Sequence, residues 1–263
     1  MFDAPAIDEG ERFPVVLFSP GLAGPRTQNT AWAEDLASRG YVVAGLDHPY
    51  DSAATVVDGR VIHTRVHATG SDEEDLRDTI GRTAIRAADL SFVRTQLGRL
   101  DRGEISGPLS GRLDTDRVAV TGHSVGGAAA LQAARQDPRF TAVVNIDGHP
   151  YDPDPRPYHQ PALGITNPIA PRDNPTYIPR LEHDLAVSTT TSYRVTVPGT
   201  AHLTFSDAAL YLPPLPALIG SVGRTEGPRI TADITAAFLD KTLRGEPGDL
   251  ATQLSRYGDL TIY

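Results

Sequence analysis

The sequence predicts an α/β fold in which a mostly parallel sheet is covered by helices on both faces. Short apolar runs rich in β-branched residues alternate with longer stretches of helical periodicity, as such a sheet requires. No repeat is found, and no linker separates two apolar cores. The 263 residues are therefore expected to form a single domain over residues 1–263.

The strands are expected where short apolar runs end in turn-forming or polar residues. They are Pro14 to Ser19, Tyr41 to Asp47, Arg117 to Thr121, Ala142 to Asp147, Ala162 to Thr166 and Tyr193 to Val197. A small hairpin is also expected, because Thr55 to Val57 and Val61 to His63 flank Asp58-Gly59, a dipeptide that favours a tight turn.

Two helices are predicted from periodicity and from the residues at their ends. Apolar residues recur at spacings of three and four from Leu76 to Leu100, which indicates a long helix. Ser71 and Glu74 fit a capping box at its start. A last helix is expected from about Thr231 to Arg244, where a glycine follows as a stop.

Composition narrows the chemistry and the partners. The formal net charge of −9 repels phosphate backbones, so nucleic acid is not expected as a partner. The absence of cysteine excludes disulfides, thiolate metal sites and a cysteine nucleophile. No transmembrane segment is expected, since no apolar run approaches about 18 residues. Without a recognisable signal peptide the protein is expected to be cytoplasmic as given, or secreted if a signal peptide was removed.

The sharpest motif is Gly-x-Ser-x-Gly, which places Ser124 between Gly122 and Gly126. It follows an apolar strand pattern and precedes a helix pattern of small residues, the context in which a serine on a strained turn acts as nucleophile. The alternative is a glycine-rich turn whose serine has no catalytic role, but such a turn does not require a strand before it and a helix after it. His123 is expected to pack, because neighbouring side chains on a tight turn diverge. The motif predicts the α/β-hydrolase fold with Ser124 as nucleophile.

A serine nucleophile needs a base, and in this fold the acid and then the histidine follow the nucleophile along the chain. His202 lies in a loop directly after the last predicted parallel strand, from which its imidazole can reach Ser124. His183 falls in a helical pattern and is expected on a solvated face. His149 and His159 belong to a proline-rich loop and are expected to be binding residues or merely exposed. His202 is therefore the predicted base.

The acid is predicted from the ends of the strands that follow the nucleophile. In most α/β hydrolases it follows the second strand after the nucleophile, but that strand ends here in Asn167-Pro168, and Asp173 lies six residues beyond Asn167. The strand before it ends directly in Asp147. Asp147 is favoured over Asp173, although an aspartate before a glycine is also a common turn residue. For the oxyanion, the loop after the first strand offers the Leu22 N–H, and Val125 offers the second donor.

Several segments together resemble the plasma-type platelet-activating-factor acetylhydrolase family and its bacterial relatives. They are Ser19-Pro-Gly-Leu-Ala-Gly24, Arg26-Thr27, Asp35-Leu-Ala-Ser-Arg-Gly-Tyr-Val-Val-Ala44, Gly-His-Ser-Val-Gly-Gly127, Asn145-Ile-Asp147 and Thr200-Ala-His202. The resemblance implies an esterase without metal that uses Ser124, Asp147 and His202, with Leu22 and Val125 as oxyanion donors, and it implies short acyl chains. Ala31-Trp32 and Leu36-Ala-Ser38 are also similar to bacterial cutinases and polyester hydrolases, but those carry their acid after the later strand.

The expected function is thus hydrolysis of short-acyl carboxylic esters through an acyl-enzyme, with a small-molecule or lipid-like ester as substrate. No cofactor is expected, and no metal, since His63 and His67 flank a strand-like run rather than sharing a helix face. A polyester or cutin hydrolase is one alternative. A catalytically silent binding protein is another, because a fold does not imply a function. The sequence gives no expectation for the oligomeric state.

Overall fold

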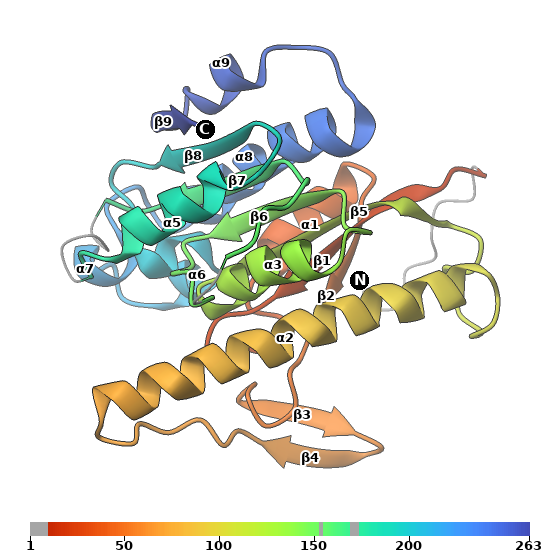
Figure 1. Cartoon of the computed structure of the whole chain (residues 1–263), viewed down its shortest axis with the longest axis horizontal. Helices are drawn as coiled ribbons and strands as arrows, with labels where there is room; N and C mark the ends of the chain where they lie inside the picture. Colours follow the sequence, from red (N-terminus) through yellow and green to blue (C-terminus); the bar gives the residue numbers. More distant parts are fainter. Residues whose placement is uncertain (1–9, 153–154, 169–173) are drawn as a thin grey trace.

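A seven-stranded sheet forms the centre of the computed structural model (Figure 1), which describes residues 10–152, 155–168 and 174–263. Its order is β2-β1-β5-β6-β7-β8-β9, and every neighbouring pair is parallel except β8 and β9, which are antiparallel. The strands are β1 Phe13–Ser19, β2 Val42–Gly45, β5 Leu113–His123, β6 Ala142–Ile146, β7 Ala162–Thr166, β8 Ser192–Thr196 and β9 Asp259–Ile262.

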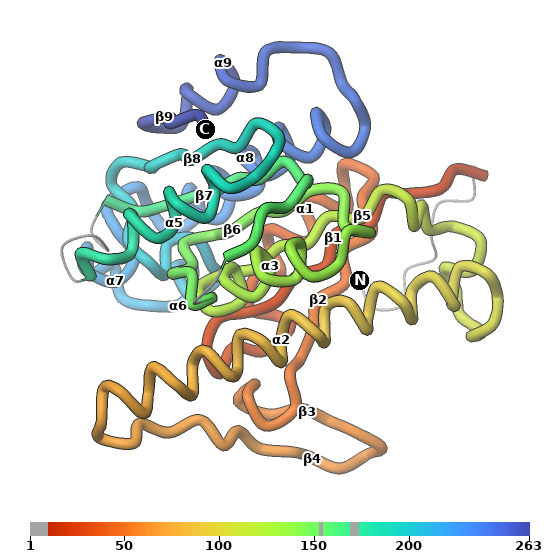
Figure 2. Tube along the Cα trace, viewed as in Figure 1, coloured from red at the N-terminus to blue at the C-terminus, as the bar shows by residue number. Residues whose placement is uncertain are grey.

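Helices cover both faces of this sheet, as Figures 1 and 2 show. One core packs α1 (Thr30–Ser38) and α8 (Glu226–Arg244) on the sheet, and the other packs α2 (Asp72–Asp101), α3 (Val125–Gln136) and α5 (Tyr177–Ala186). Alternation along β1 supplies both cores, because successive strand side chains point to opposite faces. Phe18 belongs to the first core and Leu17 to the second.

The remaining elements are short. The hairpin of β3 (Ala54–Val57) and β4 (Arg60–His63) lies outside the main sheet (Figure 1). The segment after β8 forms η1 (His202–Phe205), α6 (Ala208–Tyr211) and α7 (Pro216–Ile219). Before β9 lies α9 (Leu250–Leu254). Within the described ranges no helix combines the length and the apolar character needed to cross a membrane.

The predicted parallel strands, the long helix and the hairpin are all found, and the main differences are at ends. Ser71 accepts a hydrogen bond from the Glu74 N–H at 3.4 Å, which confirms Ser71 as the cap of α2. The return bond of the predicted capping box is replaced, because the Ser71 N–H donates to the Thr69 hydroxyl at 3.2 Å. The helix expected from Thr231 already begins at Glu226. Its first turn contains a proline, which is tolerated there because the first backbone N–H groups of a helix have no partner within the helix. Strand β9 was not predicted, since four residues at a sheet edge are too few for a clear alternation.

The first prediction concerns the core beneath α8. Phe238 is fully buried and meets the Tyr193 ring edge-on at a centroid separation of 6.5 Å. Phe238→Ala is expected to lower the free energy of unfolding by about 3–5 kcal/mol, through lost burial and the cavity left behind. Urea unfolding followed by circular dichroism measures the change. Phe92→Ala is the matched control, because Phe92 is 63% exposed, and an equal loss in both variants would contradict the assigned core.

Candidate active site

Ser124 sits on a strained turn between β5 and α3. Its backbone lies at φ 57° and ψ −127°, a region that residues with a side chain rarely adopt. A Cβ on Gly122 would overlap the Gly126 carbonyl, and a Cβ on Gly126 would overlap the Ser19 carbonyl of β1. The Ser124 N–H donates to the Ile146 carbonyl at 2.9 Å, which fastens the turn to β6. Only glycine on both sides therefore allows the turn to pack this closely.

The turn opens into a cavity of about 330 Å³ at the carboxyl ends of β5 to β8, where an open α/β sheet binds ligands. The cavity is lined by Ser124, Val125, Asp147, His149, Tyr151, Asn167, Asn174, Tyr177, Ala201, His202 and Ala217. The structure thus brings the predicted nucleophile, acid, base and one oxyanion donor to one place.

Asp147 and His202 form a direct hydrogen bond. The His202 Nδ1 lies 2.6 Å from the Asp147 Oδ2, and the Asp147 side chain is fully buried, whereas 45% of the His202 side chain is exposed. A carboxylate can only accept, so it holds the proton of a neutral imidazole on Nδ1. The Nε2 of His202 is then the nitrogen with a free lone pair.

Two further residues hold the Asp147 carboxylate. Asn167 donates to it through its backbone N–H at 3.1 Å and its side-chain Nδ2 at 2.5 Å, and the Tyr177 hydroxyl donates at 3.1 Å. Burial, with the nearby Asp147 charge, raises the pKa of Tyr177 well above its ordinary value, so this hydroxyl stays a donor. Asn167 ends the later strand and serves here as a donor to Asp147. The other candidate acid, Asp173, lies outside the described residues.

The loop that carries Leu22 is held by a buried arginine that was not among the predicted site residues. Arg86 of α2 is fully buried and donates to the Pro20 carbonyl and, at 3.1 Å, to the Gly21 carbonyl. It also pairs with Asp51 at 2.7 Å. Burial opposes ionisation of Asp51, but its hydrogen bond and ion pair with Arg86 prevail and hold its pKa below the ordinary value. The signal in the sequence that could have pointed to Arg86 is its position, as a charged residue, on the apolar face of the predicted helix.

The two predicted oxyanion donors are the backbone N–H groups of Leu22 and Val125. Within the described residues, no group accepts a hydrogen bond from the Leu22 N–H or from the Val125 N–H. Leu22 does not line the cavity with its side chain, which is exposed, but its loop lies against the serine. A Cβ on the preceding Gly21 would lie 3.4 Å from the Ser124 Cβ. Two N–H groups, one directly after Gly21 and one directly after Ser124 in the chain, fit the donor pair that an oxyanion hole requires.

His123 packs beneath the site, as predicted, but it also makes two hydrogen bonds that were not predicted. Its Nδ1 lies 3.0 Å from the Gln28 Nε2, and its Nε2 lies 3.0 Å from the His202 carbonyl. The His123 and His202 rings are 4.6 Å apart between centroids. Burial, reinforced by the charge of His202, lowers the pKa of His123 to about 3. His123 is therefore neutral at ordinary pH.

The remaining later histidines separate into one cavity residue and two exposed ones. His149 lines the cavity, packs between the Tyr151 and Tyr177 rings, and approaches the Thr176 hydroxyl at 3.3 Å through Nε2. Burial lowers its pKa. His183 is exposed on α5 as predicted, and His159 is exposed beside Thr189. The histidines of the proline-rich loop were expected to be either binding residues or merely exposed, and the position of His149 in the cavity wall fits a binding residue.

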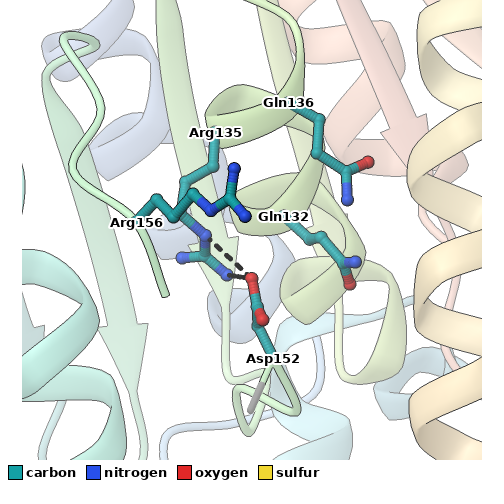
Figure 3. A pocket seen from close by; sticks show the side chains of 5 residues that line it. All are labelled: Gln132, Arg135, Gln136, Asp152 and Arg156. Atoms are coloured by element: carbon teal, nitrogen blue, oxygen red, sulfur yellow. Dashed lines mark hydrogen bonds and ion pairs between the residues drawn. The ribbon is translucent and has the colours of Figure 1, made fainter. Parts of the chain in front are cut away.

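Another pocket, of about 500 Å³, is lined by Gln132, Arg135, Gln136, Asp152 and Arg156 (Figure 3). Arg135 binds Asp152 and Asp184, each at 3.0 Å, so aspartates take up its charge. Neither Ser124 nor His202 lines this pocket, which is therefore separate from the candidate site. Across the described residues, no group of three or more His, Asp or Glu side chains could hold a metal ion.

Comparison with solved structures supports the fold. A ferulic acid esterase from Streptomyces cinnamoneus superposes with a TM-score of 0.75 at 31% identity, covering 95% of this chain and 74% of that one. The parallel sheet, the helices on both faces and the strained serine turn confirm the predicted α/β-hydrolase fold.

Comparison of sequences gives the family. The platelet-activating factor acetylhydrolase of Bos taurus is 29% identical over 157 residues, and that of Canis lupus familiaris is 30% identical over 160 residues. Each match covers 52% of this chain and 35% of the relative, so the chain spans about a third of the length of these curated relatives. A family model described as platelet-activating factor acetylhydrolase, isoform II, matches residues 3–78 and 106–247, more than half of the sequence. The chain therefore belongs to the platelet-activating factor acetylhydrolase, isoform II, family.

Proposed function

We propose that the protein is a serine carboxylic ester hydrolase that acts on short-acyl esters. The observation that carries this proposal is the cavity where Ser124, on its strained turn, meets the hydrogen-bonded pair of His202 and Asp147. The family supports the same reading, because its named members are acetylhydrolases. The solved ferulic acid esterase is a second esterase with the same fold.

In the proposed reaction, the Ser124 hydroxyl oxygen attacks the ester carbonyl carbon while the His202 Nε2 takes the hydroxyl proton. Asp147 keeps the other imidazole proton on Nδ1 and stabilises the imidazolium that forms. The Leu22 and Val125 N–H groups donate to the negative oxygen of the tetrahedral intermediate. Collapse of the intermediate releases the alcohol, which receives the proton from His202. Water, deprotonated by His202, then attacks the acyl-enzyme and releases the acid.

The size and lining of the cavity favour a small acyl group. Its volume of about 330 Å³ is at the lower end of ligand pockets, which span about 300–1,000 Å³. The His149 ring contacts the Tyr151 ring in a tilted arrangement and stacks on the Tyr177 ring, so the side of the cavity that these residues line is closely packed. Each buried methylene contributes about 0.8 kcal/mol to binding, but a methylene that the cavity cannot admit contributes nothing.

A polyester or cutin hydrolase is a second candidate, favoured by exposed apolar side chains beside the cavity. Ala217 of α7 lines the cavity, and the same segment exposes Leu215 and Leu218, while Tyr211 of α6 is 82% exposed. Exposed apolar patches next to a site suit an extended apolar surface such as a polymer film. Soluble products released from polyester film by the wild type, but not by Ser124→Ala, would support this candidate.

Replacement of the proposed nucleophile tests the chemistry. Ser124→Ala is expected to lower ester turnover by about 10⁴- to 10⁶-fold while the protein stays folded, because one hydroxyl is removed. A fluorophosphonate probe should label the wild type and the control Ser255→Ala, whose serine is exposed directly after α9, but not Ser124→Ala. Failure of the wild type to react would favour the catalytically silent binding protein.

Replacement of the proposed acid tests which strand supplies it. Asp147→Asn keeps the size of the side chain but removes the charge that stabilises the imidazolium, so kcat should fall on the order of 10²- to 10⁴-fold. Steady-state kinetics on a soluble ester measures the change. Asp173→Asn is the matched control and should change kcat little. The reverse result would place the acid after the later strand.

The acyl preference is tested with a series of p-nitrophenyl esters. kcat/KM is expected to peak between acetate and about hexanoate and to fall steeply by about dodecanoate, because long chains exceed the cavity. No jump in rate is expected at the micelle threshold of the longer esters. The same series with Ser124→Ala gives the background rate. A maximum at long chains would instead indicate a lipase.

A further inference from the structure

We propose that Gln28 and His123 are positioning residues for the proposed ester hydrolysis. They act as a hydrogen-bonded relay between the loop that carries Leu22, here called the oxyanion loop, and the loop that carries His202. The relay consists of the Gly21 N–H, the Gln28 side-chain amide, the His123 imidazole and the His202 carbonyl. It rests on the proposed function, because it is assigned to the placement of Leu22 and His202 for that reaction.

The hydrogen-bonding groups allow only one arrangement of protons along the relay. The His202 carbonyl can only accept, so the His123 Nε2 carries the hydrogen. Because His123 is neutral, its Nδ1 has a lone pair and accepts from the Gln28 Nε2 at 3.0 Å. The Gln28 Oε1 is then turned toward the Gly21 N–H and accepts from it at 2.6 Å. Each of the three hydrogen bonds thus pairs one donor with one acceptor, and reversing one bond would break the next.

The relay joins segments that are far apart in the sequence and adjacent in the site. Gly21 precedes Leu22, the proposed oxyanion donor, while His123 precedes Ser124, and the His202 carbonyl belongs to the proposed base itself. Sequence separations along the relay are 7, 95 and 79 residues. The His123 and His202 rings, tilted by 32° relative to each other, make a second contact at the same place. The buried His123 imidazole thus fixes the position of His202 relative to Ser124.

The relay and Arg86 hold opposite sides of the oxyanion loop. Arg86 binds the carbonyls of Pro20 and Gly21, whereas Gln28 binds the Gly21 N–H. The carbonyl and the N–H of Gly21 both have hydrogen-bond partners. The next N–H in the chain, that of Leu22, is therefore the one left for the substrate. Misplacement of reacting groups by about 1 Å can cost on the order of 10²-fold in rate. Loss of the relay should therefore lower kcat more than it raises KM.

Two substitutions of His123 separate positioning from packing. His123→Gln keeps an acceptor and a donor side by side, so it can reproduce both hydrogen bonds. His123→Phe keeps a ring against His202 but removes both bonds. The relay predicts kcat near the wild-type value for His123→Gln and about 10- to 100-fold lower for His123→Phe, with little change in KM. Equal kcat for the two variants, or higher kcat for His123→Phe, would overturn the proposal.

Gln28→Glu gives a signature in the pH profile. One oxygen of the introduced carboxylate still accepts from the Gly21 N–H. The other oxygen replaces the amide nitrogen, so two acceptors, this oxygen and the His123 Nδ1, now face each other. One proton must be shared between them, and the ionisable groups that act on His123 are His202 and Asp147. The ratio of kcat in this variant to kcat in the wild type should therefore fall as pH rises and that proton is lost. A constant ratio would contradict the relay, and Gln253→Glu on α9 is the control for added charge.

A spectroscopic measurement tests the relay independently of turnover. Nitrogen-15 NMR of the wild type should show His123 as the neutral Nε2–H tautomer throughout the accessible pH range. The Nδ1–H tautomer, or a charged His123 at neutral pH, would overturn the relay even in an active enzyme. If the tautomer is as expected but the wild type hydrolyses no ester, the proposed function fails and the hydrogen-bonded arrangement stands without its assigned role.

Discussion

The close approach of the turn at Ser124 to strand β1 is the constraint on which the rest of the site depends. The Ser19 carbonyl occupies the space where a side chain on Gly126 would lie, and the Gly126 carbonyl does the same for Gly122. This contact forces Ser124 into its unusual backbone conformation and leaves its side chain directed at the cavity. The strain, of order 1–3 kcal/mol, is held by the parallel pairing of β5 with β1 and β6.

The same edge of the sheet supplies the proposed acid, the proposed base and a partner of the acid. Asp147 leaves the tip of β6 with φ at 52°, which turns its carboxylate toward His202 after β8. Asn167, at the tip of β7, donates twice to that carboxylate. The acid is thus fixed by its own strand and by the next one. In the loop after β1, Arg86 binds the Gly21 carbonyl and Gln28 binds the Gly21 N–H.

Much of this arrangement could be predicted from the sequence, because its signals are local. Gly-x-Ser-x-Gly marks Ser124, and a carboxylate directly after an apolar run marks Asp147. The order of the triad along the chain and a loop after the last parallel strand mark His202. The catalytic roles of these residues remain predictions. The partners of Arg86 and Gln28 could not be predicted, since most of them are distant in the chain and hydrogen-bond direction has no sequence pattern. Helical periodicity placed Arg86 inside a helix without indicating that it binds the Pro20 and Gly21 carbonyls.

A crystal structure of the protein after reaction with an organophosphonate ester would test the central claim most directly. The adduct resembles the tetrahedral intermediate, so phosphorus should be bonded to the Ser124 Oγ. One phosphonyl oxygen should lie about 2.7–3.1 Å from the backbone nitrogens of both Leu22 and Val125. The His202 Nε2 should face the Ser124 oxygen while Asp147 remains bonded to Nδ1. Phosphorus on another residue, or a phosphonyl oxygen turned away from both nitrogens, would contradict the proposed chemistry.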